Sequence, residues 1–260
     1  MRSMIRIDTI PAFKDNYIWG LVDTATSRAT VVDPGDAAPV RAWLADQGLT
    51  LDAILITHHH GDHTGGVRQL VAESPVPVHG PAHGRIPGRT HPVADGDRVT
   101  VAGLSAPLEV REVPGHTLDH IAYTDGEHLF CGDVLFTGGC GAVFEGTNDQ
   151  MFASLERFND LPDACEVYCA HEYTLENLDF ARRVEPENAA LTRRLETARA
   201  TRERGEPTVP GTLGEERATN PFLRCREPSV IAAANRWANR DLTDAAAVFG
   251  IVRAWKDSLD

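Results

Sequence analysis

The sequence predicts an α/β domain followed by a small all-helical domain. Over the first two thirds of the chain, short apolar segments alternate with turns, and residues 53–56 form the continuous apolar run of a strand covered on both faces. After Tyr173 the apolar residues recur at helical spacing instead. We therefore expect one domain at residues 1–173 and a second at residues 174–260.

Length and charge restrict the function. The chain has 260 residues, 42% of them hydrophobic and 24% charged, as is usual for a globular enzyme with a sizeable core. A net charge of −13 argues against nucleic acids and anionic membranes as partners. No segment has the apolar length of a membrane span, and residues 1–8 lack the apolar core of a secretory signal. We infer no obligate protein partner.

The cysteines form no regular framework. Their number is odd, and the one close pair, four residues apart, has no second pair to complete a zinc motif. We predict reduced, buried and non-catalytic thiols in a cytoplasmic protein. They are Cys131, Cys140, Cys165, Cys169 and Cys225.

The strand and helix signals follow from local patterns. Residues 17–22 and 30–32 are predicted to pair, and the helix at 37–47 should end at Gly48. Thr147 and Gln150 form a capping box that opens a helix through Phe158. Other strands are expected at 53–56, 76–78, 108–113, 121–124, 129–131 and 167–169. Helices are expected at 178–184, from Pro186 to about 204, at 230–239 and at 242–256, with a loop at 206–214.

The segment T-H-H-H-G-D-H-T-G-G directly follows the buried strand. Extended backbone places alternate side chains on one side, so His58 and His60 can bind the same cation. Asp62 and His63 follow where the chain turns towards a helix, so they can face a second cation. His59 should point away from both. Without a bound cation, four polar residues at the end of a buried strand would leave unpaired polar groups, whose burial costs free energy.

Further metal ligands are expected at the ends of other strands. His116, Asp133 and His171 each come directly after an apolar strand. Imidazole and carboxylate without thiolate suit zinc, iron or manganese. For His120 a structural role and a role beside the ligands both remain open. A turn or surface role is the simpler interpretation for His79, His83, His91 and His128.

This set of residues resembles the metallo-β-lactamase fold superfamily and, within it, the glyoxalase II (hydroxyacylglutathione hydrolase) family. The resemblance runs almost from end to end. The shared motifs are P-A-F-K-D-N-Y-I-W at 11–19, V-D-P-G at 32–35, F-C-G-D at 130–133, G-G-C-G at 138–141, F-E-G-T at 144–147, A-H-E-Y-T at 170–174 and N-P-F-L-R at 220–224.

The resemblance implies a four-layer αββα sandwich with a C-terminal helical domain, two divalent ions and hydrolysis of S-D-lactoylglutathione. Zinc is the most suitable metal, with iron or manganese as alternatives. Asp62 and Asp133 would act in catalysis with a hydroxide that bridges the metals and attacks the thioester carbonyl. The implied ligands are His58, His60 and His116 for one ion, Asp62, His63 and His171 for the other, and Asp133 for both.

The same resemblance implies where the glutathione end of the substrate binds. Tyr173, Arg253 and Lys256 match glutathione-contacting positions. The family commonly has a basic residue where Ala142 stands and often a tyrosine where Phe144 stands. These two residues can therefore contact the substrate only through backbone or packing, which leaves the preference for the thiol open.

Two other functions compete with thioester hydrolysis. A persulfide dioxygenase, or another hydrolase of this fold that uses a different thiol, would share the metal loop. The dioxygenase needs one iron with open positions, which the complete second ligand set disfavours. A β-lactamase lacks support, and the charge of −13 disfavours a nuclease. A non-catalytic glutathione-binding or metal-binding protein would bind without turnover.

Overall fold

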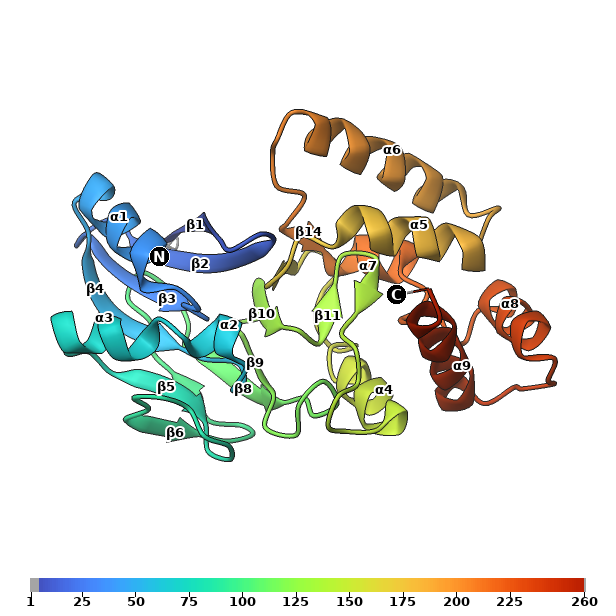
Figure 1. Ribbon diagram of the computed structural model, residues 1–260, viewed down its shortest axis with the longest axis horizontal. Helices are drawn as coiled ribbons and strands as arrows, with labels where there is room; N and C mark the ends of the chain where they lie inside the picture. The colour runs from blue at the N-terminus through green and yellow to red at the C-terminus, as the bar shows by residue number, and fades with distance from the viewer. Residues whose placement is uncertain (1–4, 260) are drawn as a thin grey trace. The chain divides into compact units, whose positions relative to one another are not determined.

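A computed structural model describes residues 5–259, which fall into two compact units. Unit 1 comprises the residues up to 112 together with 117–132. Unit 2 comprises 113–116 and the residues from 133 onwards. The predicted ligands are therefore divided between the two units, whose elements are shown in Figure 1. No helix in the described part of the chain is long and apolar enough to cross a membrane.

A mixed sheet covered by helices forms the first part of unit 1. Its strands, in spatial order, are β1 (Ile5–Ala12), β2 (Asn16–Asp23), β3 (Arg28–Val32), β4 (Thr50–Leu55), β5 (Val78–Pro81) and β6 (His91–Val93). The first three pair antiparallel, and β3 to β6 run parallel. Helices α1 (Ala37–Gln47) and α3 (Val67–Glu73) cover one face (Figure 1) and enclose a core with Val31, Val40, Ile54 and Leu70.

The second sheet of unit 1 is antiparallel. Its strands are β7 (Arg98–Val99), β8 (Leu108–Glu112), β9 (Ile121–Thr124) and β10 (His128–Gly132), with β9 between β8 and β10. The fully buried Tyr123 donates its hydroxyl to the carbonyl of Ile56 (3.0 Å), directly after β4. Burial holds the pKa of Tyr123 well above its usual value, so the phenol remains a hydrogen-bond donor. This contact ties the second sheet to the chain just before the predicted metal loop.

Unit 2 contains short strand pairs and most of the helices. Its elements are β11 (Leu135–Phe136), β12 (Gly139–Cys140), α4 (Asn148–Glu156), β13 (Glu166–Cys169), α5 (Thr174–Val184), α6 (Ala189–Glu203), β14 (Gly211–Thr212), α7 (Leu213–Thr219), α8 (Pro228–Ala238) and α9 (Ala245–Asp257). Leu178, Leu191 and Leu195 are buried between α5 and α6, which lie side by side in Figure 1. The rings of Phe222 and Phe249, 5.5 Å apart, join α9 to the segment before α8.

Most predicted elements are confirmed. The strands predicted at 17–22, 30–32, 108–113, 121–124, 129–131 and 167–169 are present with ends shifted by at most two residues. Gly48 ends α1 in the left-handed conformation (φ 64°). Thr147 and Gln150 form the predicted capping box, although α4 ends at Glu156 rather than Phe158.

Other predictions were wrong at the ends of elements. Pro186 does not open the long helix, because Asn188 accepts from the N–H groups of Ala190 and Leu191 and so begins α6 at Ala189. The strand predicted at 76–78 lies instead at Val78–Pro81. The region from 174 onwards is not entirely helical as predicted, since β14 pairs with β13. The structure also contains elements that were not predicted: β1, β6, β7, β11, β12 and α7.

Candidate metal centre

The predicted metal loop follows β4 and continues into the short helix α2 (Gly61–Thr64). His58 and His63 are fully buried, and their ring centroids lie 4.1 Å apart. The donor atoms of His58 and His60 lie within 4.8 Å of each other, as do those of Asp62 and His63. Unit 1 thus presents two pairs of imidazole and carboxylate donors at the end of a buried strand.

His59 has a different environment. Its Nδ1 lies 2.8 Å from the Asp119 carboxylate, so the ring is held by that residue. His120 stacks on His58 with ring centroids 4.5 Å apart and planes at 18°. A role for His120 in packing the ligand ring is consistent with this geometry.

Asp33 orients two of the histidines. Its carboxylate accepts hydrogen bonds from the backbone N–H of Thr57 (2.8 Å), from the Thr57 hydroxyl (2.7 Å) and from Nδ1 of His63 (3.1 Å). Because the Thr57 hydroxyl donates to Asp33, it accepts from Nδ1 of His58 (3.0 Å). Both rings therefore carry their proton on Nδ1, which leaves Nε2 as the ligand nitrogen.

The V-D-P-G motif is explained by close packing in this region. Asp33 adopts a positive φ of 53°, and a Cβ at Gly35 would lie 1.7 Å from the carbonyl oxygen of Asp62. Only glycine fits at position 35, because any side chain would displace the metal loop. Asn16, 7% exposed, donates to the Asp62 carboxylate (3.0 Å) and so orients a second predicted ligand.

Unit 2 brings together the other predicted ligands. His116, Asp133 and His171 are all buried, and one carboxylate oxygen of Asp133 lies 3.4 Å from Nε2 of each histidine. Nδ1 of His116 donates to the carbonyl of Ala142 (2.8 Å), so its Nε2 also carries the lone pair. The two 3.4 Å distances between the Asp133 carboxylate and the histidine nitrogens exceed those of strong hydrogen bonds. One oxygen of the Asp133 carboxylate therefore lies close to the donor nitrogen of each histidine.

The chemistry of the donors fits divalent cations. Each unit buries imidazole nitrogens beside a carboxylate, and neither set includes a thiolate. Two lone pairs that face each other repel unless a proton or a cation lies between them. Burial of polar groups without such compensation raises the free energy of the folded protein. Nitrogen and oxygen donors without sulfur are typical of zinc, iron and manganese.

The predicted substrate residues in unit 2 differ in exposure. Phe144 is 69% exposed, and its ring lies 5.1 Å from that of His116. Tyr173 stacks on His171, with centroids 4.8 Å apart and planes at 6°. Lys256 is partly exposed and lines a hollow of about 430 Å³ with Phe180 and Arg183.

Arg253 is 4% exposed and already bound within unit 2. It donates to the carbonyl of Cys140 (3.0 Å), forms an ion pair with Asp257 (2.7 Å) and lies over the ring of Phe222. Arg253 and Lys256, which match glutathione-contacting positions by resemblance, therefore differ in exposure. Lys256 is the more accessible cation of the two.

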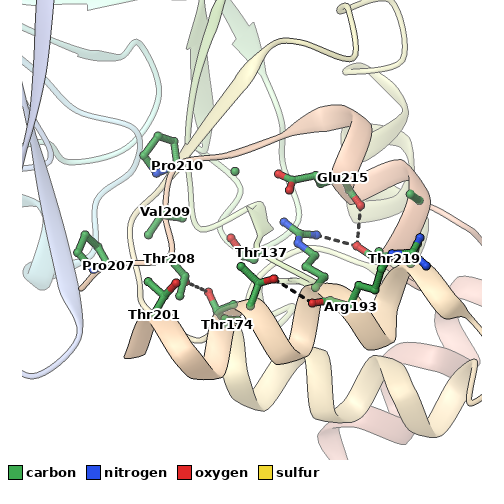
Figure 2. A pocket seen from close by; sticks show the side chains of 16 residues that line it. Thr137, Thr174, Arg193, Thr201, Pro207, Thr208, Val209, Pro210, Glu215 and Thr219 are labelled. Carbon is green, nitrogen blue, oxygen red and sulfur yellow. Dashed lines mark hydrogen bonds between the residues drawn. The ribbon is translucent and has the colours of Figure 1, made fainter. Parts of the chain in front are cut away.

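A larger cavity of about 590 Å³ opens elsewhere in unit 2, between α6, α7 and the segment 207–211. Figure 2 shows its threonine-rich wall, in which the Thr208 hydroxyl donates to that of Thr174 (2.6 Å). Arg193 and Glu215 contribute opposite charges. None of the predicted metal or substrate residues lines it. The predicted metal ligands and this cavity are therefore separate features of the protein.

Sequence comparison identifies the family. A family model described as "Metallo-beta-lactamase superfamily" matches residues 19–171, and one described as "Hydroxyacylglutathione hydrolase C-terminus" matches residues 172–259. The chain is 56% identical to a hydroxyacylglutathione hydrolase of Alkalilimnicola ehrlichii, over 98% of this chain and 99% of that protein. It is 50% identical to one of Nitrosomonas europaea, over 98% and 97%. The chain belongs to the hydroxyacylglutathione hydrolase family.

Solved structures agree with the family's fold. ETHE1 from Myxococcus xanthus matches with a TM-score of 0.64 and 24% identity, over 98% of each chain. TTHA1623 in a di-iron-bound form matches with a TM-score of 0.52 and 26% identity, over 64% of this chain and 91% of that one. The predicted metallo-β-lactamase sandwich with a C-terminal helical region is thereby confirmed.

Sequence reasoning missed three residues that orient ligands: Asp33, Thr57 and Asn16. All three lie inside motifs that the family resemblance had marked. No pattern in the sequence relates Asp33 to His63, because their contact forms only when β3 and β4 lie side by side.

Replacing Asp33 with Asn should weaken metal binding by about 10- to 100-fold, the usual effect of losing a residue that orients a ligand. Asp33 accepts three hydrogen bonds through two carboxylate oxygens. The amide of Asn has one acceptor oxygen and an NH2 donor in place of the other, so at least one of the bonds from Thr57 and His63 is lost. Competition with a chromophoric chelator measures the zinc affinity. Asp36→Asn is the matched control, because Asp36 caps α1 through Ala38 and Asn caps a helix equally well. Equal affinities for the two variants would contradict this role for Asp33.

The cysteines should be unreactive in the folded protein. All five are buried, and burial raises the pKa of Cys140 to about 11 and that of Cys169 to about 12. At pH 8 only about one in a thousand Cys140 side chains would be thiolate. Iodoacetamide should label almost no thiols at pH 8 in native protein and all five in urea, as measured by mass spectrometry. Rapid labelling of any single cysteine in native protein would refute the prediction.

Proposed function

We propose that the protein hydrolyses S-D-lactoylglutathione and related 2-hydroxyacyl-glutathione thioesters to a 2-hydroxy acid and glutathione, the second step of methylglyoxal detoxification. The main support is identity of 50–56% over nearly the whole chain to proteins named hydroxyacylglutathione hydrolase. The buried imidazole and carboxylate donors of each unit supply the matching chemistry. We assign catalysis to a domain at 1–173 and substrate binding to a helical domain at 174–260.

We assign the seven predicted ligands to two divalent ions, most suitably zinc. The ligands are His58, His60 and His116 for the first ion, Asp62, His63 and His171 for the second, and Asp133 for both. The related protein TTHA1623 has been solved in a di-iron-bound form, which supports a binuclear centre. When bound, such ions polarise a carbonyl oxygen and lower the pKa of water from 15.7 to about 7.

The chain's own residues prepare the ligands for this chemistry. Asp33 and Thr57 hold the Nδ1 protons of His63 and His58, and the carbonyl of Ala142 holds that of His116. Each ring is therefore fixed with Nε2 as its ligand atom. The leaving thiolate is a weak base, since free cysteine has a pKa of about 8.5, so its departure requires no dedicated general acid.

We propose that Tyr173, Arg253 and Lys256 recognise the glutathione part of the substrate, with Ala142 and Phe144 contributing backbone or packing contacts. Lys256 offers the accessible cation. Arg253 is bound by Asp257, whose side chain is 51% exposed. A substrate carboxylate would therefore share or replace the Asp257 carboxylate on that guanidinium.

We place the protein in the cytoplasm. The observation in favour is that Cys131, Cys140, Cys165, Cys169 and Cys225 are all free thiols, as expected in a reducing compartment.

Steady-state hydrolysis of a thioester panel that varies the thiol and the acyl group separately tests the function. Lactoylglutathione should be the best substrate, and active protein should contain two metal ions per chain. Asp133→Ala should lose both ions and nearly all turnover, because its carboxylate is assigned to both sites. One ion per chain with full turnover would refute the binuclear centre. Oxygen consumption with glutathione persulfide, in place of thioester hydrolysis, would favour the dioxygenase alternative.

Lys256→Ala should raise KM for lactoylglutathione by about tenfold and largely spare kcat, because a charge-assisted contact made equally in ground and transition states is lost. A small thioester without the glutathione carboxylates should be unaffected. Arg240→Ala is the control, since it removes an exposed cation from the same unit. A parental KM in Lys256→Ala would exclude Lys256 from substrate binding.

A further inference from the structure

The hairpin formed by β11 and β12 connects two parts of the candidate metal centre. It begins two residues after Asp133 and ends two residues before Ala142, whose carbonyl orients His116. We propose that buried side chains of the C-terminal helices, above all Asn177, Asn220 and Glu216, are positioning residues that fix this hairpin and thereby set the metal affinity. This inference rests on the proposed metal centre and adds a role for the helical domain beyond substrate binding.

Helix α7 and its C-cap provide most of the contacts. Glu216, which is fully buried, accepts from the N–H of Gly138 (2.8 Å) and from the side-chain amide of Asn220 (2.9 Å). The same amide donates to the carbonyls of Phe136 (3.3 Å) and Gly139 (2.9 Å). Two adjacent turns of one helix thus satisfy three backbone groups of the hairpin.

Helices α5 and α9 hold the hairpin from other directions. Asn177 donates to the carbonyl of Thr137 (3.2 Å), and Arg253 donates to that of Cys140 (3.0 Å). The packing is tight, since a Cβ at Gly139 would lie 2.6 Å from the side-chain carbon of Asn177. Five polar backbone groups between Phe136 and Cys140 are therefore bound by helix side chains.

A buried charge pair keeps Glu216 in place. Its second carboxylate oxygen binds Arg194 of α6, which also donates to the hydroxyl of Thr219 (2.7 Å). Arg194 and Thr219 line the cavity seen in Figure 2, so the pair connects the wall of that cavity to the hairpin. A buried carboxylate with three donors is well compensated, and its loss would leave backbone groups of the hairpin unsatisfied.

The end of the hairpin is in direct contact with the predicted ligands Asp133 and His116. The N–H of Gly141 donates to the carbonyl of Val134 (3.3 Å), which closes the hairpin beside Asp133. A Cβ at Gly141 would lie 2.0 Å from the carbonyl oxygen of Asp133 and 3.1 Å from Nδ1 of His116. The backbone of Gly141, directly after the hairpin, is therefore packed closely against Asp133 and His116.

The test compares three Asn→Leu variants of the full-length protein. Asn177→Leu and Asn220→Leu remove bonds to the hairpin. Asn235→Leu removes the matched bonds to the backbone of Leu242 (2.8 and 3.0 Å), which lies outside the hairpin. The melting temperature of the apoprotein, the zinc affinity from chelator competition, and kcat and KM on lactoylglutathione are measured for each.

All three variants should melt at lower temperature than the parent. Only Asn177→Leu and Asn220→Leu should bind zinc about tenfold or more weakly and show a reduced kcat with little change in KM. If both bind zinc as tightly as Asn235→Leu, the positioning role is refuted. If Asn220→Leu fails to fold, Asn177→Leu, which loses a single bond, decides the question alone. A parent protein that binds none of zinc, iron and manganese would refute the proposed metal centre itself.

Discussion

The carboxylate of Asp33 is the acceptor on which the metal loop of unit 1 depends. A buried strand that ends in consecutive polar residues needs partners for their polar atoms, because an unpaired buried donor costs about 1–3 kcal/mol. Asp33 satisfies the backbone and hydroxyl of Thr57 together with the ring of His63. The same bonds fix the protonated nitrogen of each ring, so a requirement of burial also determines which atom can bind a metal.

Unit 2 meets the same requirement in a different way. His116 is oriented by a backbone carbonyl, that of Ala142, rather than by a side chain. The position of a backbone acceptor depends on the chain segment that contains it. Ala142 lies two residues after the short hairpin of β11 and β12, which has only two pairs of facing residues. The helices compensate by donating side-chain groups to that hairpin, with Asn220 and Glu216 contributing most. Under the proposed function, substrate recognition and the geometry of the predicted ligands would thus depend on the same C-terminal helices.

The sequence predictions for the start of α6, for α7 and for β5 were wrong for physical reasons. Pro186 is acceptable in the first turn of a helix, but the side chain of Asn188 caps two N–H groups and therefore fixes the start of α6 later in the chain. The short helix α7 was assigned in part to a loop, although Thr212 and Glu215 form a capping box. At β5 the two prolines of P-V-P-V at 75–78 made the strand boundaries difficult to predict, since proline cannot donate to a sheet ladder.

The sequence alone determined the fold class, the family and the residue types of the predicted metal ligands, because strand periodicity, motif spacing and donor chemistry are all local properties. It also located these ligands at strand ends, where chain direction changes. Only the tertiary structure decided how the side chains of these residues are oriented and which basic side chains are accessible to solvent. Asp33 meets His63 across 30 residues, and Arg253 meets Cys140 across 113. Such contacts arise from the packing of separate elements, and no local pattern distinguishes a buried Arg253 from one that faces solvent.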